Sequence, residues 1–164
     1  MWKDTLSVRL WSLRNVFLLW FVKPSIVEIN DQRAVVRIPL NWRTKRHDIH
    51  AMYLGTLCMG ADVAGGLIAF NLVRRSKANV SFIFKDIRGE FLKRAEGDVH
   101  FTCTDGPLMQ DLVARALASD ERQEATVKII ATVPKKLGDE AVARFDLTLS
   151  VKKRGRPVIS GSSR

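Results

Sequence analysis

The residue whose type and setting best suit chemistry is Asp62, the single charge in an apolar stretch from Met52 to Val73. A carboxylate among apolar side chains is desolvated, which raises its pKa and makes it a stronger base. Such a group suits proton abstraction from water. The same carboxylate could instead be structural, satisfied by backbone groups or by a partner subunit.

The stretch around Asp62 predicts a long buried helix, because apolar residues occupy every face of it. Glycines in a helix interior each cost about 1 kcal/mol relative to alanine. Four of them here indicate that a neighbouring element presses closely on the helix: Gly55, Gly60, Gly65 and Gly66. A membrane span is the disfavoured alternative, because Asp62 at mid-span would cost about 2.5 to 3.5 kcal/mol.

The segments on both sides of this helix alternate between apolar and polar residues, as half-buried strands do. They predict a hairpin over residues 25–40, a strand over 80–91 with a bulge near Lys85 and Asp86, and strands over 99–103, 125–133 and 141–151. A short helix is expected over 108–119, capped by Thr104 or Asp105, and Asp48 could cap the central helix. The expected fold class is α+β, with a curved antiparallel sheet wrapped around one long central helix.

Residues 1–24 predict an N-terminal amphipathic helix that Pro24 ends. Its apolar positions recur at helical spacing: Leu6, Leu10, Leu13, Phe17 and Trp20. We expect the helix to lie on the domain through this face, with membrane-surface docking the less favoured use of it. An acid and two arginines precede the apolar run and no small-residue cleavage site follows it, so a signal peptide is not indicated.

The chain carries 27 Lys and Arg against 17 Asp and Glu, a formal net charge of +10 that favours anionic partners. Part of this excess lies in residues 154–164, which we expect to form a basic flexible tail after a main domain over 25–153. The run from Lys153 to Pro157 contains the Arg-Gly-Arg-Pro core of a minor-groove hook, so nucleic-acid binding stays open as the less favoured alternative. Cys58 and Cys103 lack metal-type spacing, and no metal site is expected.

Two runs resemble hot-dog-fold thioesterases of the phenylacetate-pathway type. The first is Tyr53-Leu54-Gly55-Thr56-Leu57 with Asp62 and Ala64-Gly65-Gly66-Leu67, similar to a helix motif in which His-Gly-Gly precedes a catalytic acid. The second, Phe91 to Val99, resembles the turn and Gly-Asp hairpin of the same proteins. An uncharacterised thioesterase-like branch, in which tyrosine often replaces the motif histidine, is especially similar. The resemblance covers roughly residues 25–153 and implies a hot-dog fold.

The resemblance implies that Asp62 acts as general base or nucleophile and that the backbone N–H of Gly55 polarises a thioester carbonyl. It further implies an acyl-CoA or related acyl-thioester as substrate, no cofactor, and a homodimer or dimer of dimers. The two cysteines, interpreted as reduced thiols, indicate a cytoplasmic location. Candidate substrate-binding residues are His47, His50, Tyr53, Lys93 and Arg94.

This chain departs from the motif at Tyr53, where histidine is expected, and at Arg46-His47-Asp48, where the branch usually has an asparagine. A non-catalytic acyl-binding or scaffold dimer therefore stays open beside the hydrolase.

Overall fold

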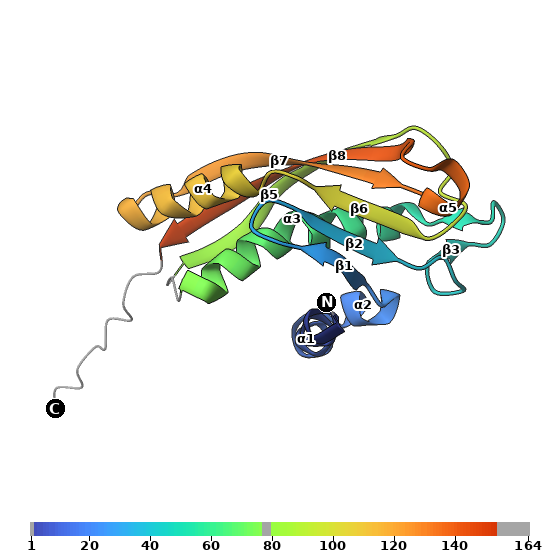
Figure 1. Cartoon of the computed structure of the whole chain (residues 1–164), viewed down its shortest axis with the longest axis horizontal. Coiled ribbons are helices and arrows are strands. Elements are labelled where there is room, and N and C mark those ends of the chain that lie inside the picture. The colour runs from blue at the N-terminus through green and yellow to red at the C-terminus, as the bar shows by residue number, and fades with distance from the viewer. Residues whose placement is uncertain (1, 77–79, 154–164) are drawn as a thin grey trace, which may run out of the picture.

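The structure, a computed structural model, describes residues 2–76 and 80–153 and has one antiparallel sheet folded around one long helix (Figure 1). Six strands form this sheet in the order β1-β2-β6-β7-β8-β5. They are β1 (Ser25–Ile29), β2 (Ala34–Ile38), β6 (Val99–Cys103), β7 (Gln123–Thr132), β8 (Ala141–Lys153) and β5 (Val80–Phe91). The central helix is α3 (Leu54–Ser76), and α4 (Gly106–Ala118) packs beside it. The expected α+β architecture is confirmed.

The sheet presses directly on α3 at three of its four predicted glycines, whereas Gly55 is covered by Tyr53. A Cβ atom at Gly60 would overlap the buried ring of Phe101 on β6. At Gly65 it would lie 3.3 Å from the Cδ1 atom of Ile129 on β7. Side chains at these positions would push the helix off the sheet, so the glycines set how closely the two layers pack.

The sheet registers match the alternation in the sequence. β5 pairs with β8 along its whole length, and the register shifts between Phe84 and Asp86, which confirms the predicted bulge. β1 and β5 are the two edges of the sheet. Within the described residues α3 is also the one helix long and apolar enough to span a membrane, but the core helix of a soluble fold passes the same test. Its place inside the sheet identifies it as the core helix.

Neither carboxylate expected at a helix start makes a capping hydrogen bond, although the predicted N-cap position of Asp105 is confirmed. Asp48 forms a bidentate ion pair with Arg46 at 2.8 and 2.9 Å instead of capping α3. Asp105 stands at the N-cap position of α4, but its carboxylate accepts a hydrogen bond from the backbone N–H of Lys128, 2.6 Å away. In both cases the carboxylate binds another donor instead of the free N–H groups at the start of the helix.

Short elements in the connections were not expected from the sequence. They are α2 (Phe17–Val22), the two-residue ladder of β3 (Lys45–Arg46) with β4 (Ala51–Met52), and α5 (Pro134–Leu137). The last of these occupies the loop between β7 and β8, where a simple turn was expected around Gly138.

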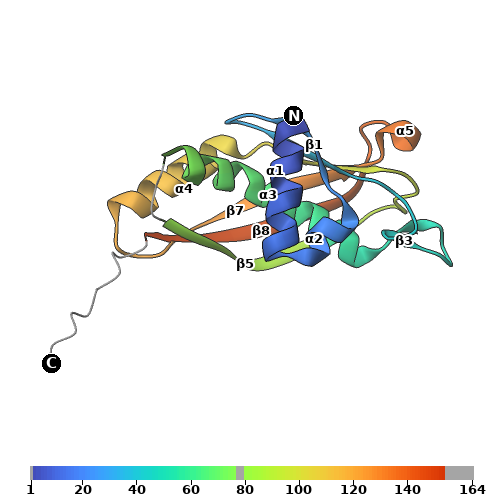
Figure 2. The same ribbon diagram turned by 90° about the horizontal axis from the view of Figure 1, so that it is seen from below.

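The N-terminal helix α1 (Trp2–Asn15) lies on the domain with the opposite face from the one expected. It crosses over α3, as Figure 2 shows, and buries the hydroxyl-bearing residues Thr5 and Ser12. The hydroxyl of Thr5 accepts a 3.0 Å hydrogen bond from the backbone N–H of Ile26. Most of the apolar stripe is exposed: Leu6, Leu13 and Phe17 point outward, whereas Leu10 is exposed but borders the space between α1 and α3. The expectation that this stripe packs on the domain is therefore wrong.

The contact between Gly60 and Phe101 generates a stability prediction. Gly60→Ala should destabilise the protein by about 1–3 kcal/mol, because the new methyl group overpacks a buried aromatic ring. Gly66→Ala is the matched control, since its Cβ would lie in ordinary contact 3.4 Å from the Phe84 ring and alanine favours the helix by about 1 kcal/mol. Urea unfolding of both variants measures the difference, and equal stabilities would contradict this account of the packing.

Candidate active site

A groove of about 540 Å³ lies between α1 and α3, and Asp62 is one of the residues that line it. Its walls are mostly apolar. The helix α1 contributes Val8, Trp11 and Ser12, the helix α3 contributes Asp62, Gly66, Phe70 and Asn71, and β5 contributes Phe82 and Phe84. The rings of Trp11 and Phe70 meet across the groove with their centroids 5.8 Å apart. The site therefore has the size and lining of a pocket for an apolar group.

Asp62 is half-buried in this groove and has no hydrogen-bond or ion-pair partner among the described residues. Burial alone raises the pKa of its carboxyl group. Both features follow from its position on α3, where the neighbouring side chains are apolar. The carboxylate is thus a partly desolvated group of raised basicity.

Gly55 lies in the first turn of α3, where backbone N–H groups have no acceptor within the helix. The ring of the exposed Tyr53 covers it, since a Cβ at Gly55 would lie 2.6 Å from the Tyr53 Cε1 atom. Gly55 and Asp62 are seven residues apart, which corresponds to about 10 Å along a helix axis. Within one chain they therefore do not converge on a single carbonyl group.

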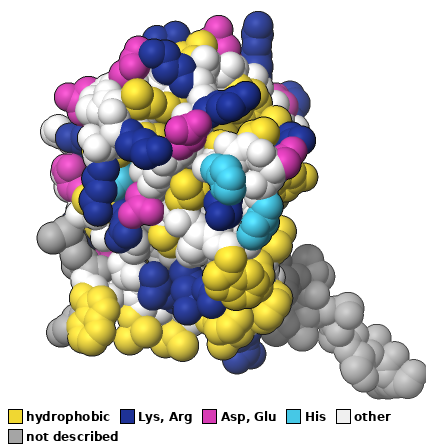
Figure 3. Space-filling view, turned by 90° about the vertical axis from the view of Figure 1, so that its right-hand side faces the viewer, with side chains coloured by type: hydrophobic (Ala, Val, Ile, Leu, Met, Phe, Trp, Pro, Cys, Tyr) yellow, Lys and Arg dark blue, Asp and Glu magenta, His cyan; other side chains and the backbone are white. Residues whose placement is uncertain are grey.

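The other predicted binding residues lie near the start of α3, at the end of the molecule seen in Figure 3, and none of them lines the groove. His47 and His50 are exposed in the connection between β3 and β4. Lys93 forms an ion pair with Glu140, whereas Arg94 has no ion-pair partner in the described part of the chain. The turn that carries them contacts the helix entry, because the backbone N–H of Met52 donates to the carbonyl of Ala95 at 2.9 Å.

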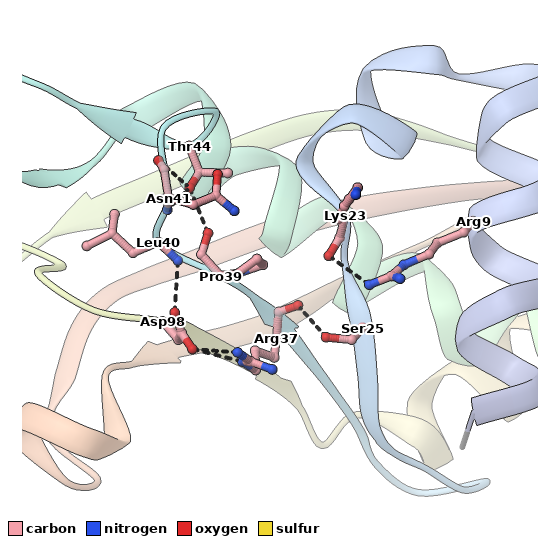
Figure 4. Close-up of polar contacts among 9 residues, drawn as sticks. All are labelled: Arg9, Lys23, Ser25, Arg37, Pro39, Leu40, Asn41, Thr44 and Asp98. Carbon is pink, nitrogen blue, oxygen red and sulfur yellow. Dashed lines mark hydrogen bonds and ion pairs between the residues drawn. The ribbon is translucent and has the colours of Figure 1, made fainter.

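Asp98, from the Gly-Asp hairpin, acts as a clamp (Figure 4). Its carboxylate accepts hydrogen bonds from the guanidinium of Arg37 at 2.6 and 3.0 Å and from the backbone N–H of Leu40 at 2.9 Å. Burial opposes the charge of Asp98, but these donors outweigh it and lower the pKa. The clamp joins the end of β2 to the start of β6 and so anchors the loop that leads into α3.

Sequence reasoning missed the residues of the groove that come from α1. Ser12 is fully buried there, and its hydroxyl has no hydrogen-bond partner among the described residues. No spacing within α1 signals this position. On α3 a signal existed, because Asp62, Gly66 and Phe70 recur every four residues and share one helix face. Within the described residues no cluster of three or more His, Cys, Asp or Glu side chains could hold a metal ion.

Solved structures with the same architecture identify the fold class. A protein from Pseudomonas aeruginosa described as a probable thioesterase is 18% identical, with a TM-score of 0.73 and coverage of 92% of this chain and 96% of its own. A thioesterase from Haemophilus influenzae is 15% identical, with a TM-score of 0.65 and coverage of 87% of both chains. A protein of unknown function from Chlorobaculum tepidum is 8% identical, with a TM-score of 0.79 and coverage of 93% and 96%.

The chain therefore has the hot-dog fold of thioesterase-like proteins, as the resemblance implied. It belongs to the family described as Domain of unknown function (DUF4442), whose model matches residues 13–151. No curated protein matches the chain.

The raised pKa of Asp62 predicts how stability depends on pH. The ionised carboxylate is less stable in the folded protein than in the unfolded chain, so its favourable contribution is full below the ordinary pKa of 3.8 and is lost as pH rises through the folded pKa. We expect Asp62→Asn to melt at or above the wild-type temperature at pH 7, with the difference shrinking toward pH 4. Calorimetry across this range measures it.

The exposed Asp120→Asn is the control for charge removal alone. A clear loss of stability in Asp62→Asn at pH 7 would contradict the prediction and indicate a carboxylate held by a structural partner.

Proposed function

We propose that the protein hydrolyses an acyl-thioester such as an acyl-CoA, with Asp62 as general base or nucleophile. One observation carries the proposal: a half-buried carboxylate, unpaired among the described residues, lines a mostly apolar groove of about 540 Å³. An acyl chain suits the walls, and a carboxylate of raised basicity suits the chemistry. The thioesterase-like fold is consistent with this use.

In the general-base route Asp62 takes a proton from water while the hydroxide oxygen bonds to the thioester carbonyl carbon. The tetrahedral oxyanion then collapses, the carbon–sulfur bond breaks, and the thiolate receives the proton that Asp62 holds. In the nucleophilic route a carboxylate oxygen attacks the same carbon, the carbon–sulfur bond breaks, and the thiolate leaves behind an acyl–Asp62 anhydride. Water then cleaves the anhydride, which frees the Asp62 carboxylate and the acyl carboxylate and releases two protons, one of which the thiolate takes up. Both routes need an N–H donor for the oxyanion, which we assign to Gly55.

The separation of Gly55 and Asp62 along α3 leads to a homodimer as the working unit. Two helix turns keep them apart in one chain, so we infer that Gly55 of the partner subunit faces Asp62. The edge strand β5 supplies a pairing surface, because no strand of the described residues pairs with its outer N–H and C=O groups. It also exposes three large apolar side chains, Ile83, Ile87 and Phe91.

The end of the molecule near the start of α3, which carries Lys93 and Arg94, suits the phosphates of coenzyme A. Arg94 is the better candidate of the two predicted cations, since Glu140 already neutralises Lys93. His47, His50 and Tyr53 lie at the same end and are available for polar contacts with the cofactor part of the substrate. With coenzyme A thioesters as substrates, we propose a cytoplasmic location for the protein. The basic tail and its DNA-hook run lie outside the described residues.

A non-catalytic acyl-binding dimer is the second candidate, and the ring of Tyr53 favours it. The ring lies over Gly55 and narrows access to the helix start, where the oxyanion would bind. Such a protein would keep the groove but would not turn substrate over.

Asp62→Asn separates the two candidates. For a hydrolase we expect kcat to fall by about 100- to 10,000-fold, because the amide keeps the shape of the carboxylate but cannot accept the proton. Free-thiol release from a panel of acyl-CoA substrates measures turnover, and calorimetric titration should show acyl-CoA affinity retained. Wild-type protein that binds acyl-CoA without releasing thiol would identify the non-catalytic candidate.

The dimer is tested at β5. Sedimentation should show a dimer or dimer of dimers at micromolar concentration, and Ile83→Lys with Ile87→Lys should yield monomers that have lost turnover although Asp62 is intact. Ile130→Lys, on β7 away from this edge, should leave both properties unchanged. A stable wild-type monomer with full activity would contradict the shared site.

A further inference from the structure

We propose that the outer face of α1 and α2, together with Trp42, docks onto an anionic lipid bilayer. This outer face is defined by the exposed apolar residues Trp2, Leu6, Leu13, Phe17, Leu18 and Trp42. The proposal is independent of whether Asp62 is catalytic. It reverses the preference drawn from the sequence alone, because that preference assumed that the apolar stripe of α1 faced the domain.

The first support is the inverted polarity of α1. A surface helix normally buries its apolar stripe and exposes its polar residues. Here Thr5 and Ser12 are buried, while Leu6 is 55% and Leu13 is 46% exposed. The orientation is held by specific bonds, from the Ile26 N–H to the Thr5 hydroxyl and from the Arg9 guanidinium to the carbonyl of Pro24 at 3.1 Å. The leucines are thus held facing outward by the fold.

The second support is the placement of tryptophan. The chain has four tryptophans, and all lie on α1, on α2 or in the adjoining loop: Trp2, Trp11, Trp20 and Trp42. Trp2 is 87% and Trp42 is 66% exposed. Trp42 lies in the turn between β2 and β3, and this turn packs against α2, since the rings of Trp42 and Phe21 meet edge to face with their centroids 5.8 Å apart. Tryptophan is enriched where proteins meet the polar boundary of a bilayer, because its ring is apolar and its N–H is a donor.

The third support is charge complementarity. Cations border the outer face, and none has an ion-pair partner among the described residues: Arg9, Arg14, Lys23 and Arg43. Between Trp2 and Lys23 the only acid is Asp4, which lines the groove on the other side of α1. Figure 3 shows hydrophobic side chains along the lower rim, on the side of α1 and α2, with Lys and Arg side chains directly above them. Apolar residues flanked by cations are the pattern of a helix that lies in an anionic interface.

A second copy of the chain fits this face less well. An isologous contact would bring the same cations of both copies together, with no acid of the outer face to neutralise them. An anionic bilayer instead accepts the apolar stripe and the cations at once. Docking would also place α1, one wall of the groove, against the lipid.

Vesicles test the proposal without any activity assay. Wild-type protein should co-sediment with vesicles of phosphatidylglycerol and phosphatidylcholine, bind pure phosphatidylcholine at least about tenfold more weakly, and lose affinity with added salt. Since Trp2 and Trp42 are exposed on the outer face, intrinsic fluorescence should shift to the blue on binding and be quenched by brominated lipid.

Leu6→Ser with Leu13→Ser should weaken vesicle binding by about a hundredfold, because each leucine is worth roughly a factor of ten or more in buried apolar area. The matched control is Ile130→Ser, at a position that is 46% exposed like Leu13 but lies on the sheet. Arg14→Glu with Lys23→Glu should weaken binding by about tenfold or more, whereas Arg88→Glu with Lys128→Glu should not.

Two results would overturn the proposal. One is wild-type protein that stays in the supernatant with unchanged fluorescence at high vesicle concentration. The other is a leucine double variant that loses an oligomeric contact in sedimentation while vesicle binding is unaffected, which would assign the outer face to a second copy of the chain.

Discussion

The close approach of the sheet to α3 is the constraint on which the rest of the structure depends. The ring of Phe101 occupies the space that a side chain at position 60 would need, so residue 60 must be glycine. The helix face that carries Gly60 therefore faces the sheet. Residues two apart on a helix differ by about 200° in direction. Fixing Gly60 against β6 therefore turns Asp62 away from the sheet and toward the groove under α1. The position of the candidate catalytic carboxylate is thus a consequence of core packing.

Much of the fold could be predicted because local sequence and long-range packing agree there. Alternating residues on β2 and β6 pair in register from Ala34 with Cys103 to Ile38 with Val99. Even the bulge after Phe84 showed in the shift of the apolar set. The capping bonds are absent because a carboxylate binds its best available donor. Asp48 binds Arg46, two residues away, and Asp105, although it stands at the N-cap of α4, binds a backbone N–H of β7.

The candidate site likewise has one part that the sequence predicts, Asp62 on α3, and one part that it does not, the wall formed by α1. Asp62 stands out in the sequence because a lone charge in an apolar helix needs a reason, and α3 alone determines its environment. The opposite wall belongs to α1, whose facing side is set by two hydrogen bonds to the start of β1, one accepted by Thr5 and one donated by Arg9. Apolar periodicity finds an amphipathic helix but does not tell which side is buried. The prediction assigned the wrong side of α1 to the domain because the leucines repeat at helical spacing, whereas the bonds of Thr5 and Arg9 depend on distant segments that no spacing reveals.

The inverted helix also relates the two surfaces of α1 to each other. Its inner side brings Trp11 against Phe70 and places in the groove the hydroxyl of Ser12, which has no partner within residues 2–76 and 80–153, while its outer side carries Leu6 and Leu13. A helix tied to the domain at few points is the element most easily displaced, since few buried apolar contacts hold it. Whatever covers the outer leucines therefore acts on the wall of the groove as well. Access to Asp62 and the environment of the outer face are, for this reason, properties of the same helix.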